Sequence, residues 1–394
     1  MESYLKRGYI EFLTLSPVFI GGGKELNKKE YIYDRNNGNV QLVDFRRLYE
    51  GLQSRQLVDA FESYLMEDAY ANNPDNRNQG RPQRGNRELI EFLRDNRVPE
   101  AAYKTWYMGS VKVADKSMNL RSAKSIQMFM RDAQNRPYIP GSSFKGMLRT
   151  VLEGRYFLAH RDEADEVAGA VMGAEKKKRN WYLAEEDREI DVRAMHREIF
   201  EVCSGNPRRS LADQNNDMLR GLLVADSGPI GLEDMCICEK IDVSVRGEER
   251  RIGTFRECVK PGVVIRMPIT IDTRVCEFRV GDILAAMEAF NKNYISQFAG
   301  KFKAEAPTRG NVTTFYLGGG AGYLSKTVTY GIMHGPEAVR VTAEIIDATL
   351  GDRARREHRH SRDPVTGVSP HTLKCTRYQG RLCQMGACCV KRYV

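Results

Sequence analysis

The sequence lacks the features that would assign it to a membrane or a secretory pathway. No segment of the 394 residues approaches the run of about 18 apolar residues that crosses a bilayer. The first residues, MESYLKRGYIEFLTL, contain neither the apolar core nor the small-residue cleavage site of a secretory signal. Long low-complexity tracts are also missing, while 41% of the residues are hydrophobic and 29% are charged. We therefore expect a folded, cytoplasmic protein that does not contact membrane.

Motifs of nucleotide hydrolysis and of hydrolases are missing too. Residues 319–326, GGAGYLSK, hold glycine, serine and lysine in an order that does not make a phosphate-binding P-loop. No GxSxG, HExxH or DxD pattern occurs, and of the six histidines only His358 and His360 are close in sequence. Asp115 and Asp226 remain as isolated carboxylates, of which Asp226 fits a turn at the end of an apolar strand. We predict no catalytic residue.

The nine cysteines do not have the spacing of a metal site. Cys236 and Cys238 are one residue apart, as on one face of a strand, and the cysteines near the C-terminus form no C-x2-C pair. We interpret them as reduced, structural thiols and predict no metal ligand and no cofactor. Stoichiometric zinc in an elemental analysis would favour the alternative, a metal site.

The net charge of +9 is concentrated near the C-terminus. Residues 353–394 hold ten Lys or Arg side chains against Glu357 and Asp363, while the preceding 352 residues hold 51 basic and 50 acidic side chains. This basic C-terminal segment indicates a polyanionic partner, for which nucleic acid is the first candidate in the cytoplasm. A solvated, disordered tail is the equally simple alternative.

Strand-like and helical segments alternate along the whole chain. β-branched and aromatic runs predict strands at 9–20, 31–33, 40–44, 107–115, at several places within 219–275, and just before Gly318. Helical spacing of apolar residues appears at 45–66, 87–96 and 281–298, and in a helix that begins near Ser143, which either Ser142 or Ser143 can cap. We predict one α+β domain over residues 1–394, with helical insertions at approximately 45–105 and 155–220.

Three glycine-bearing segments have the same chemical features. They are Gly21–Lys24, Gly141–Lys145 and Gly318–Gly320. Each is expected to expose backbone at the end of a strand, where a glycine lets the main chain approach a phosphate and a nearby serine or lysine adds a donor. A glycine triplet is more often a plain turn, and a basic pair on a helix is more often a solvated face, so the prediction depends on the three occurring together. The candidate RNA-binding residues are Gly21, Gly22, Gly23, Lys24, Arg121, Lys124, Ser142, Ser143, Lys145, Arg149, Gly318, Gly319, Gly320 and Lys326.

Several blocks resemble the RAMP superfamily of CRISPR proteins. They are LSPVFIGGGKELNKKEYI, YIPGSSFKGMLRT, LRGLLVADSGPI, LGGGAGYLSKTV and SPHTLKCT, spread from about residue 10 to residue 380. Their order and the chain length look most like the subunit on the guide-RNA 3′-end side of type III-A effector complexes. The resemblance implies a modified RRM-like, ferredoxin-type core, and Gly21–Lys24 and Gly318–Gly320 with Lys326 as its glycine loops.

The resemblance also implies a function and partners. The subunit would bind the guide RNA (crRNA) without cleaving it, cap the filament of repeated backbone subunits and support guide maturation in antiviral defence. Target RNA and host trimming nucleases are further implied partners. An endoribonuclease acting on guide precursor or target RNA is the enzymatic alternative, and the repeated backbone subunit itself is a third, which the length of the chain disfavours.

Overall fold

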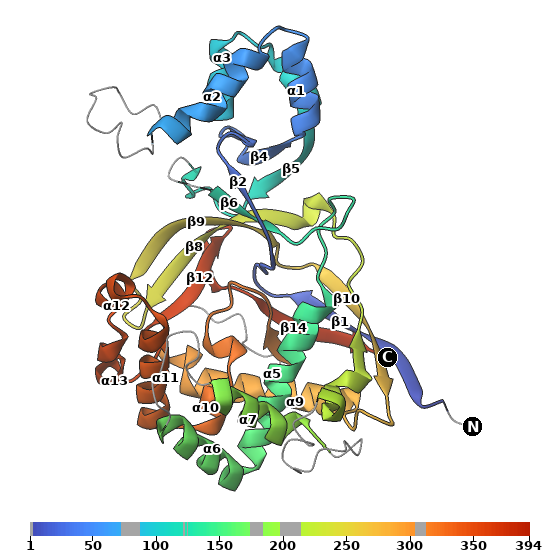
Figure 1. Ribbon diagram of the computed structural model, residues 1–394, viewed down its shortest axis with the longest axis vertical. Helices are drawn as coiled ribbons and strands as arrows, with labels where there is room; N and C mark the ends of the chain where they lie inside the picture. Colours follow the sequence, from blue (N-terminus) through green and yellow to red (C-terminus); the bar gives the residue numbers. More distant parts are fainter. Residues whose placement is uncertain are drawn as a thin grey trace.

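Two β-sheets and the helices packed on them make up the computed structural model of this chain (Figure 1). The structure describes residues 3–71, 87–120, 123, 125–173, 184–197, 214–303 and 313–394. Within these ranges, no helix is both long enough and apolar enough to cross a membrane. The predicted α+β class is confirmed, whereas the division into one domain with two insertions stays a prediction.

The first sheet has five strands, and each neighbouring pair is antiparallel. In spatial order the strands are β11 (Thr314–Tyr316), β14 (Ala387–Tyr393), β1 (Leu5–Thr14), β10 (Val264–Asp272) and β7 (Leu222–Val224). The basic C-terminal segment therefore supplies β14, an inner strand. The alternative of a disordered tail is wrong, because residues 387–393 hydrogen-bond to strands on both sides.

The second sheet is larger and curves through the middle of the molecule (Figure 1). Its order is β2 (Gly21–Asn27), β6 (Ser125–Phe129), β9 (Glu249–Val259), β8 (Met235–Ser244), β5 (Tyr107–Val113), β4 (Asn39–Val43) and β3 (Tyr31–Asp34). The other half of β8 pairs with β12 (Thr372–Tyr378), which forms a hairpin with β13 (Arg381–Gln384). Most of the predicted strands are confirmed in this way.

Helices occupy the two ends of the molecule (Figure 1). At one end lie α1 (Phe45–Gln53), α2 (Val58–Ala71), α3 (Leu89–Asp95) and α4 (Glu100–Tyr103). At the other lie α5 (Gly141–Ala159), α6 (Arg161–Gly173), α7 (Ala184–Met195), α9 (Val280–Gln297), α10 (Thr329–Ile332), α11 (Gly335–Thr349), α12 (Asp352–His358) and α13 (Asp363–Thr366). The helical spacing seen at 45–66 thus corresponds to two helices.

Two hydrophobic clusters form the core. The larger one joins both sheets to helices α5, α6, α7, α9, α10 and α11. In it, the ring of Phe144 on α5 stacks on the ring of Phe12 on β1, with the two ring centroids 5.6 Å apart. The smaller cluster packs Leu48, Phe61 and Trp106 with other residues of the 32–106 region. The first predicted insertion therefore has a core of its own.

The start of α5 is fixed by a segment more than 80 residues away in sequence. The N–H of Gly141 donates to Oδ1 of Asp226 at 2.8 Å, and neither Ser142 nor Ser143 caps the helix, because it already begins at Gly141. The predicted serine cap is wrong, and Asp226 does this work instead of forming only a turn. A Cβ at Gly141 would lie 2.2 Å from the carbonyl oxygen of Val224, so a side chain there would push α5 off β7.

We expect Gly141→Ala to destabilise the fold by about 1–3 kcal/mol, as overpacking against backbone does. Gly146→Ala on the same helix is the matched control, because nothing lies within 4 Å of a Cβ there. That control should gain about 0.5–1 kcal/mol from helix propensity. Urea denaturation measures both values, and equal effects at the two positions would contradict the proposed close approach.

Candidate nucleic-acid interface

The connection between β1 and β2 brings the predicted glycine segments together. The N–H of Gly319 donates to the carbonyl of Phe19 at 2.7 Å, and the N–H of Met130 donates to the carbonyl of Ile20 at 2.8 Å. A Cβ at Gly318 would lie 2.0 Å from the same Phe19 oxygen, and Gly318 has a φ of +88°, so glycine is needed there on both counts. The loop that contains Gly318–Gly320 is therefore held against the residues preceding Gly21.

The segment that leads into α5 joins the same junction. Tyr138 N–H donates to the carbonyl of Met130, and the N–H of Met130 in turn donates to the carbonyl of Ile20. Ser142 is exposed and Ser143 is half-buried at the start of the helix. All three predicted glycine-bearing segments thus run beside one another, while Arg121 and Lys124 lie outside the described residues.

The first glycine segment differs from its predicted form. Gly21–Lys24 is not a loop but the beginning of β2, and the pairing with β6 shifts between Gly21 and Glu25. Three residues of β2 therefore face a single residue of β6, which makes a bulge. All four residues are exposed, so the bulge still presents backbone to solvent.

Lys24 also lines a pocket of about 860 Å³, together with residues 42–46 at the start of α1, residues 134–137 and residues 229–232. The exposed side chains of Phe45 and Met108 lie in its wall, so the pocket combines a cation with apolar surface.

Arg149 and Lys145 have different surroundings although they lie on the same helix. The Arg149 guanidinium pairs with Asp191 of α7 and with Asp217, just before a short 3-10 helix at Met218–Gly221. Lys145 has no hydrogen bond or ion pair within the described part of the chain. Its surroundings lower the pKa of Lys145, mainly through burial. Arg149 is thus paired with two carboxylates, whereas Lys145 is influenced by Asp217 without forming an ion pair within the described residues.

Four basic side chains lie close together on strands β8, β9 and β12 and on the short helix at Leu324–Lys326. We call Lys240, Arg256, Lys326 and Lys374 the cationic face. Arg256 stands opposite Cys238 in the β8–β9 pair, and Lys374 stands opposite Asp242 in the β12–β8 pair. The guanidinium of Arg256 lies over the ring of Phe19 at 4.8 Å, which connects this face to the glycine segments.

The charges on this face repel one another. Burial, followed by Lys374, lowers the pKa of Lys240, and burial followed by Arg256 lowers the pKa of Lys326. Asp242 accepts from Lys374 at 2.8 Å, but neither Lys240 nor Lys326 forms an ion pair with any residue that the structure describes. A polyanion would relieve this repulsion, which makes the face a candidate phosphate-binding surface.

The sequence analysis missed Lys240, Arg256 and Lys374 as site residues. The two-residue alternation Cys236, Cys238, Lys240, Asp242 indicated a strand with a charged end, but the partners of that strand are far away in sequence. The same-face prediction for the two cysteines is confirmed, since their Sγ atoms are 3.6 Å apart. Asp115 accepts hydrogen bonds from the N–H groups of Ser117 and Gly380, which fastens a loop.

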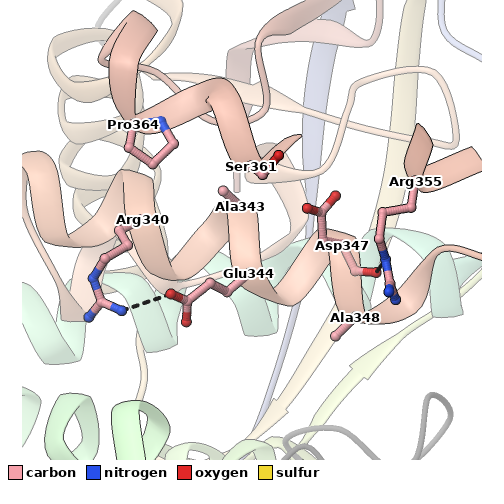
Figure 2. Close-up of a pocket in the computed structure, with 8 residues that line it drawn as sticks. All are labelled: Arg340, Ala343, Glu344, Asp347, Ala348, Arg355, Ser361 and Pro364. Carbon is pink, nitrogen blue, oxygen red and sulfur yellow. Dashed lines mark hydrogen bonds and ion pairs between the residues drawn. The ribbon is translucent and has the colours of Figure 1, made fainter. Parts of the chain in front are cut away.

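A second pocket, of about 360 Å³, holds two basic and two acidic side chains in its wall (Figure 2). It lies between α11 and the segment at residues 355–364, and Arg340 pairs with Glu344 in its wall at 2.9 Å. Arg355 donates to the carbonyl of Asp347 at 3.0 Å. Its two arginines are therefore engaged within the protein, and the pocket does not extend the cationic face.

This combination of one antiparallel and one mixed sheet, glycine segments and a cationic face agrees with the sequence model of the RAMP superfamily, which matches residues 11–323. The chain belongs to the RAMP superfamily. More particularly, it is similar to a Mycobacterium tuberculosis (strain CDC 1551 / Oshkosh) protein named "CRISPR system Cms protein Csm5", with 27% identity over 411 residues and 98% of each chain covered. A Streptococcus thermophilus relative with the same name is 26% identical and covers 81% of this chain and 79% of its own.

Two solved structures share the fold. One belongs to "Cryo-EM structure of Csm-crRNA-target RNA ternary complex in type III-A CRISPR-Cas system", with a TM-score of 0.52 and 18% identity, over 98% of this chain and 100% of that chain. The other is "Crystal structure of T.onnurineus Csm5", with a TM-score of 0.52 and 17% identity, over 96% of this chain and 100% of that chain. The resemblance to a type III-A CRISPR protein predicted from the sequence blocks is confirmed.

We expect Arg149→Ala to lower the free energy of unfolding by about 1–3 kcal/mol, because Asp191 and Asp217 would lose their shared cation. Lys145→Ala is the matched control on the same helix and should change stability by less than about 0.5 kcal/mol. Thermal and urea denaturation of both variants decide this. Similar stability of the two variants would mean that the Arg149 pairs contribute nothing.

Glu153, one turn after Arg149, predicts a dependence of stability on pH. Burial, reinforced by Asp191, raises the pKa of Glu153 to about 8 in the folded protein. In the unfolded chain this pKa is about 4.3, so the folded state holds an extra proton between these values. The free energy of unfolding should therefore fall as the pH rises from about 4.5 to about 8.

Glu153→Gln removes this dependence, so its stability relative to the natural chain should increase between pH 5 and pH 8. Glu288→Gln, on the exposed side of α9, is the control and should show no such trend. Urea denaturation at about five pH values measures the difference. A Glu153→Gln curve parallel to that of the natural chain would contradict the raised pKa.

Proposed function

We propose that this chain is the guide-binding subunit on the 3′-end side of a type III-A CRISPR effector complex, and that it has no catalytic role. The observation that carries the proposal is the cationic face, on which neither Lys240 nor Lys326 forms an ion pair within the described ranges. The name shared by the curated relatives, and the crRNA and target RNA in one structural relative, support the choice of RNA as the polyanion.

The proposed RNA path follows the junction at Phe19–Ile20. The cationic face would hold phosphates, and the segments Gly21–Lys24, Ser142–Lys145 and Gly318–Gly320 would allow the sugar–phosphate backbone to approach closely. Arg121 and Lys124 remain part of this proposed surface. We assign Arg149 to the positioning of α5, because two carboxylates already share its guanidinium.

The remaining parts of the proposal concern the assembly. The sheets would form a modified RRM-like core, and the subunit would end the filament of repeated backbone subunits, bind guide RNA beside target RNA and protect a guide that host nucleases trim to length. Such a complex would work in the cytoplasm. In this proposal the protein binds the guide RNA and thereby limits how far it is trimmed, and other proteins cleave the RNA.

We expect the double variant Lys240→Ala/Lys326→Ala to bind single-stranded RNA about tenfold more weakly, equivalent to about 1.4 kcal/mol. The slope of log affinity against log salt should fall by about 0.7 for each phosphate that the variant no longer neutralises. Lys292→Ala/Lys391→Ala, which removes two exposed lysines elsewhere, is the charge-matched control. Fluorescence anisotropy at several salt concentrations measures both, and equal weakening in the two double variants would refute a specific cationic face.

The place of the subunit in the complex needs a separate experiment. Native mass spectrometry of the tagged protein purified from its host should show one copy per assembly, together with RNA and repeated backbone subunits. Recovery of the chain without RNA and without partners would refute the proposal. Incubation of the isolated chain with labelled precursor RNA tests the endoribonuclease alternative, which requires cleavage by this chain alone.

A further inference from the structure

A buried carboxylate near the C-terminus gathers two histidines that come from separate elements of the chain. Asp363, at the start of α13, is 1% exposed. Its Oδ2 atom lies 2.9 Å from Nδ1 of His360, and its Oδ1 atom lies 2.6 Å from Nδ1 of His371. The hydroxyl of Ser369 donates to Oδ2 at 2.7 Å. The carboxylate of Asp363 thus orients both imidazole rings, in each case through the Nδ1 atom of the ring.

We propose that His360, Asp363 and His371 form a binding site for a divalent transition metal, of which Zn²⁺ fits best. One ligand atom from each residue can be chosen so that all three lie within 4.8 Å of one another. Two imidazoles and a carboxylate are a usual ligand set for Zn²⁺ with an open fourth position, and nitrogen ligands disfavour Mg²⁺ and Ca²⁺.

The proton balance of metal binding is simple. Without metal, each Nδ1 carries a proton that it donates to Asp363. With metal, each imidazole carries a proton only on Nε2, and the lone pair of Nδ1 binds the ion, so the Nδ1 proton must leave that atom. The ligand atoms of a tetrahedral zinc site lie about 3.3 Å apart. His360 Nδ1, 2.9 Å from Oδ2, and His371 Nδ1, 2.6 Å from Oδ1, would therefore move away from the carboxylate by about 0.4 Å and about 0.7 Å, respectively.

The surroundings hold the three ligands in place. The hydroxyl of Tyr330 on α10 donates to the carbonyl of Ser369 at 2.9 Å, and Ser369 in turn donates to Asp363. This is the kind of outer contact that fixes metal ligands. On the other side, Ser361 and Pro364, each next to a ligand in sequence, lie over α11 (Figure 2).

The position of the site relates it to the cationic face. His371 immediately precedes β12, and Lys374 of that strand hydrogen-bonds Thr372 at 3.1 Å. His360 lies in a 3-10 helix, His360–Arg362, which follows α12 directly. A metal ion at this point would fasten the arginine-rich segment to the strand that carries Lys374.

We expect the full-length protein, exposed to excess Zn²⁺ and then dialysed, to retain one equivalent of zinc by elemental analysis. His371→Asn should retain none, and it should stay folded because this side chain is 28% exposed. His160→Asn, an exposed histidine next to α6, is the matched control and should retain one equivalent. Ser369→Ala should weaken zinc binding by about 10–100-fold, as the loss of an outer contact does.

Co²⁺ provides a readout on the natural chain that does not depend on any variant. A stoichiometric Co²⁺ complex should show the visible absorption of a four-coordinate site with nitrogen and oxygen ligands, and Zn²⁺ should displace it. Absence of both zinc retention and cobalt absorption in the natural chain would overturn the proposal and leave a hydrogen-bonded cluster. Equal zinc retention by His371→Asn would overturn the assignment of the ligands.

Discussion

Two consecutive backbone carbonyls, those of Phe19 and Ile20, organise the proposed RNA surface. They accept hydrogen bonds from Gly319 and Met130, residues that are separated by almost 190 positions in the sequence. The glycine loop fits only because position 318 has no side chain, since a Cβ would collide with the Phe19 oxygen. Without this close contact, the loop would not lie beside the bulge in β2, and Lys326 would not be near Arg256.

Positive charge has two different roles in this fold. Arg149 is shared by two carboxylates and ties α5 to α7, so it works as part of the scaffold. Lys240 and Lys326 are held near other cations, and neither forms an ion pair within the described residues. Keeping such charges in proximity costs folding energy, which the binding of a phosphate backbone, as proposed, would offset. The distinction between the two roles depends on tertiary neighbours and not on residue type.

The sequence allowed the local features to be predicted, and it failed where distant segments meet. The alternation of apolar residues and the turn residues predicted the strands around Tyr31–Tyr33 and Val264–Asp272. The glycine-containing sequence blocks predicted membership of the RAMP superfamily. The cap on α5 could not be read from GSSFK, because the acceptor is Asp226 on another segment. Arg256 was hidden because its face depends on the β8–β9 register, and the histidine cluster was hidden because Asp363 links residues eleven positions apart.

The inner position of β14 has a consequence for biogenesis. While the chain is being made, β1 can pair with β10 but leaves its other edge open until residues 387–393 emerge from the ribosome. Gly386, the residue just before this segment, supplies the carbonyl to which Leu317 N–H donates beside the glycine loop. Strand pairing over such a separation is slow, because a long loop must close first. A prematurely terminated polypeptide would therefore lack the contact that holds the glycine loop in place.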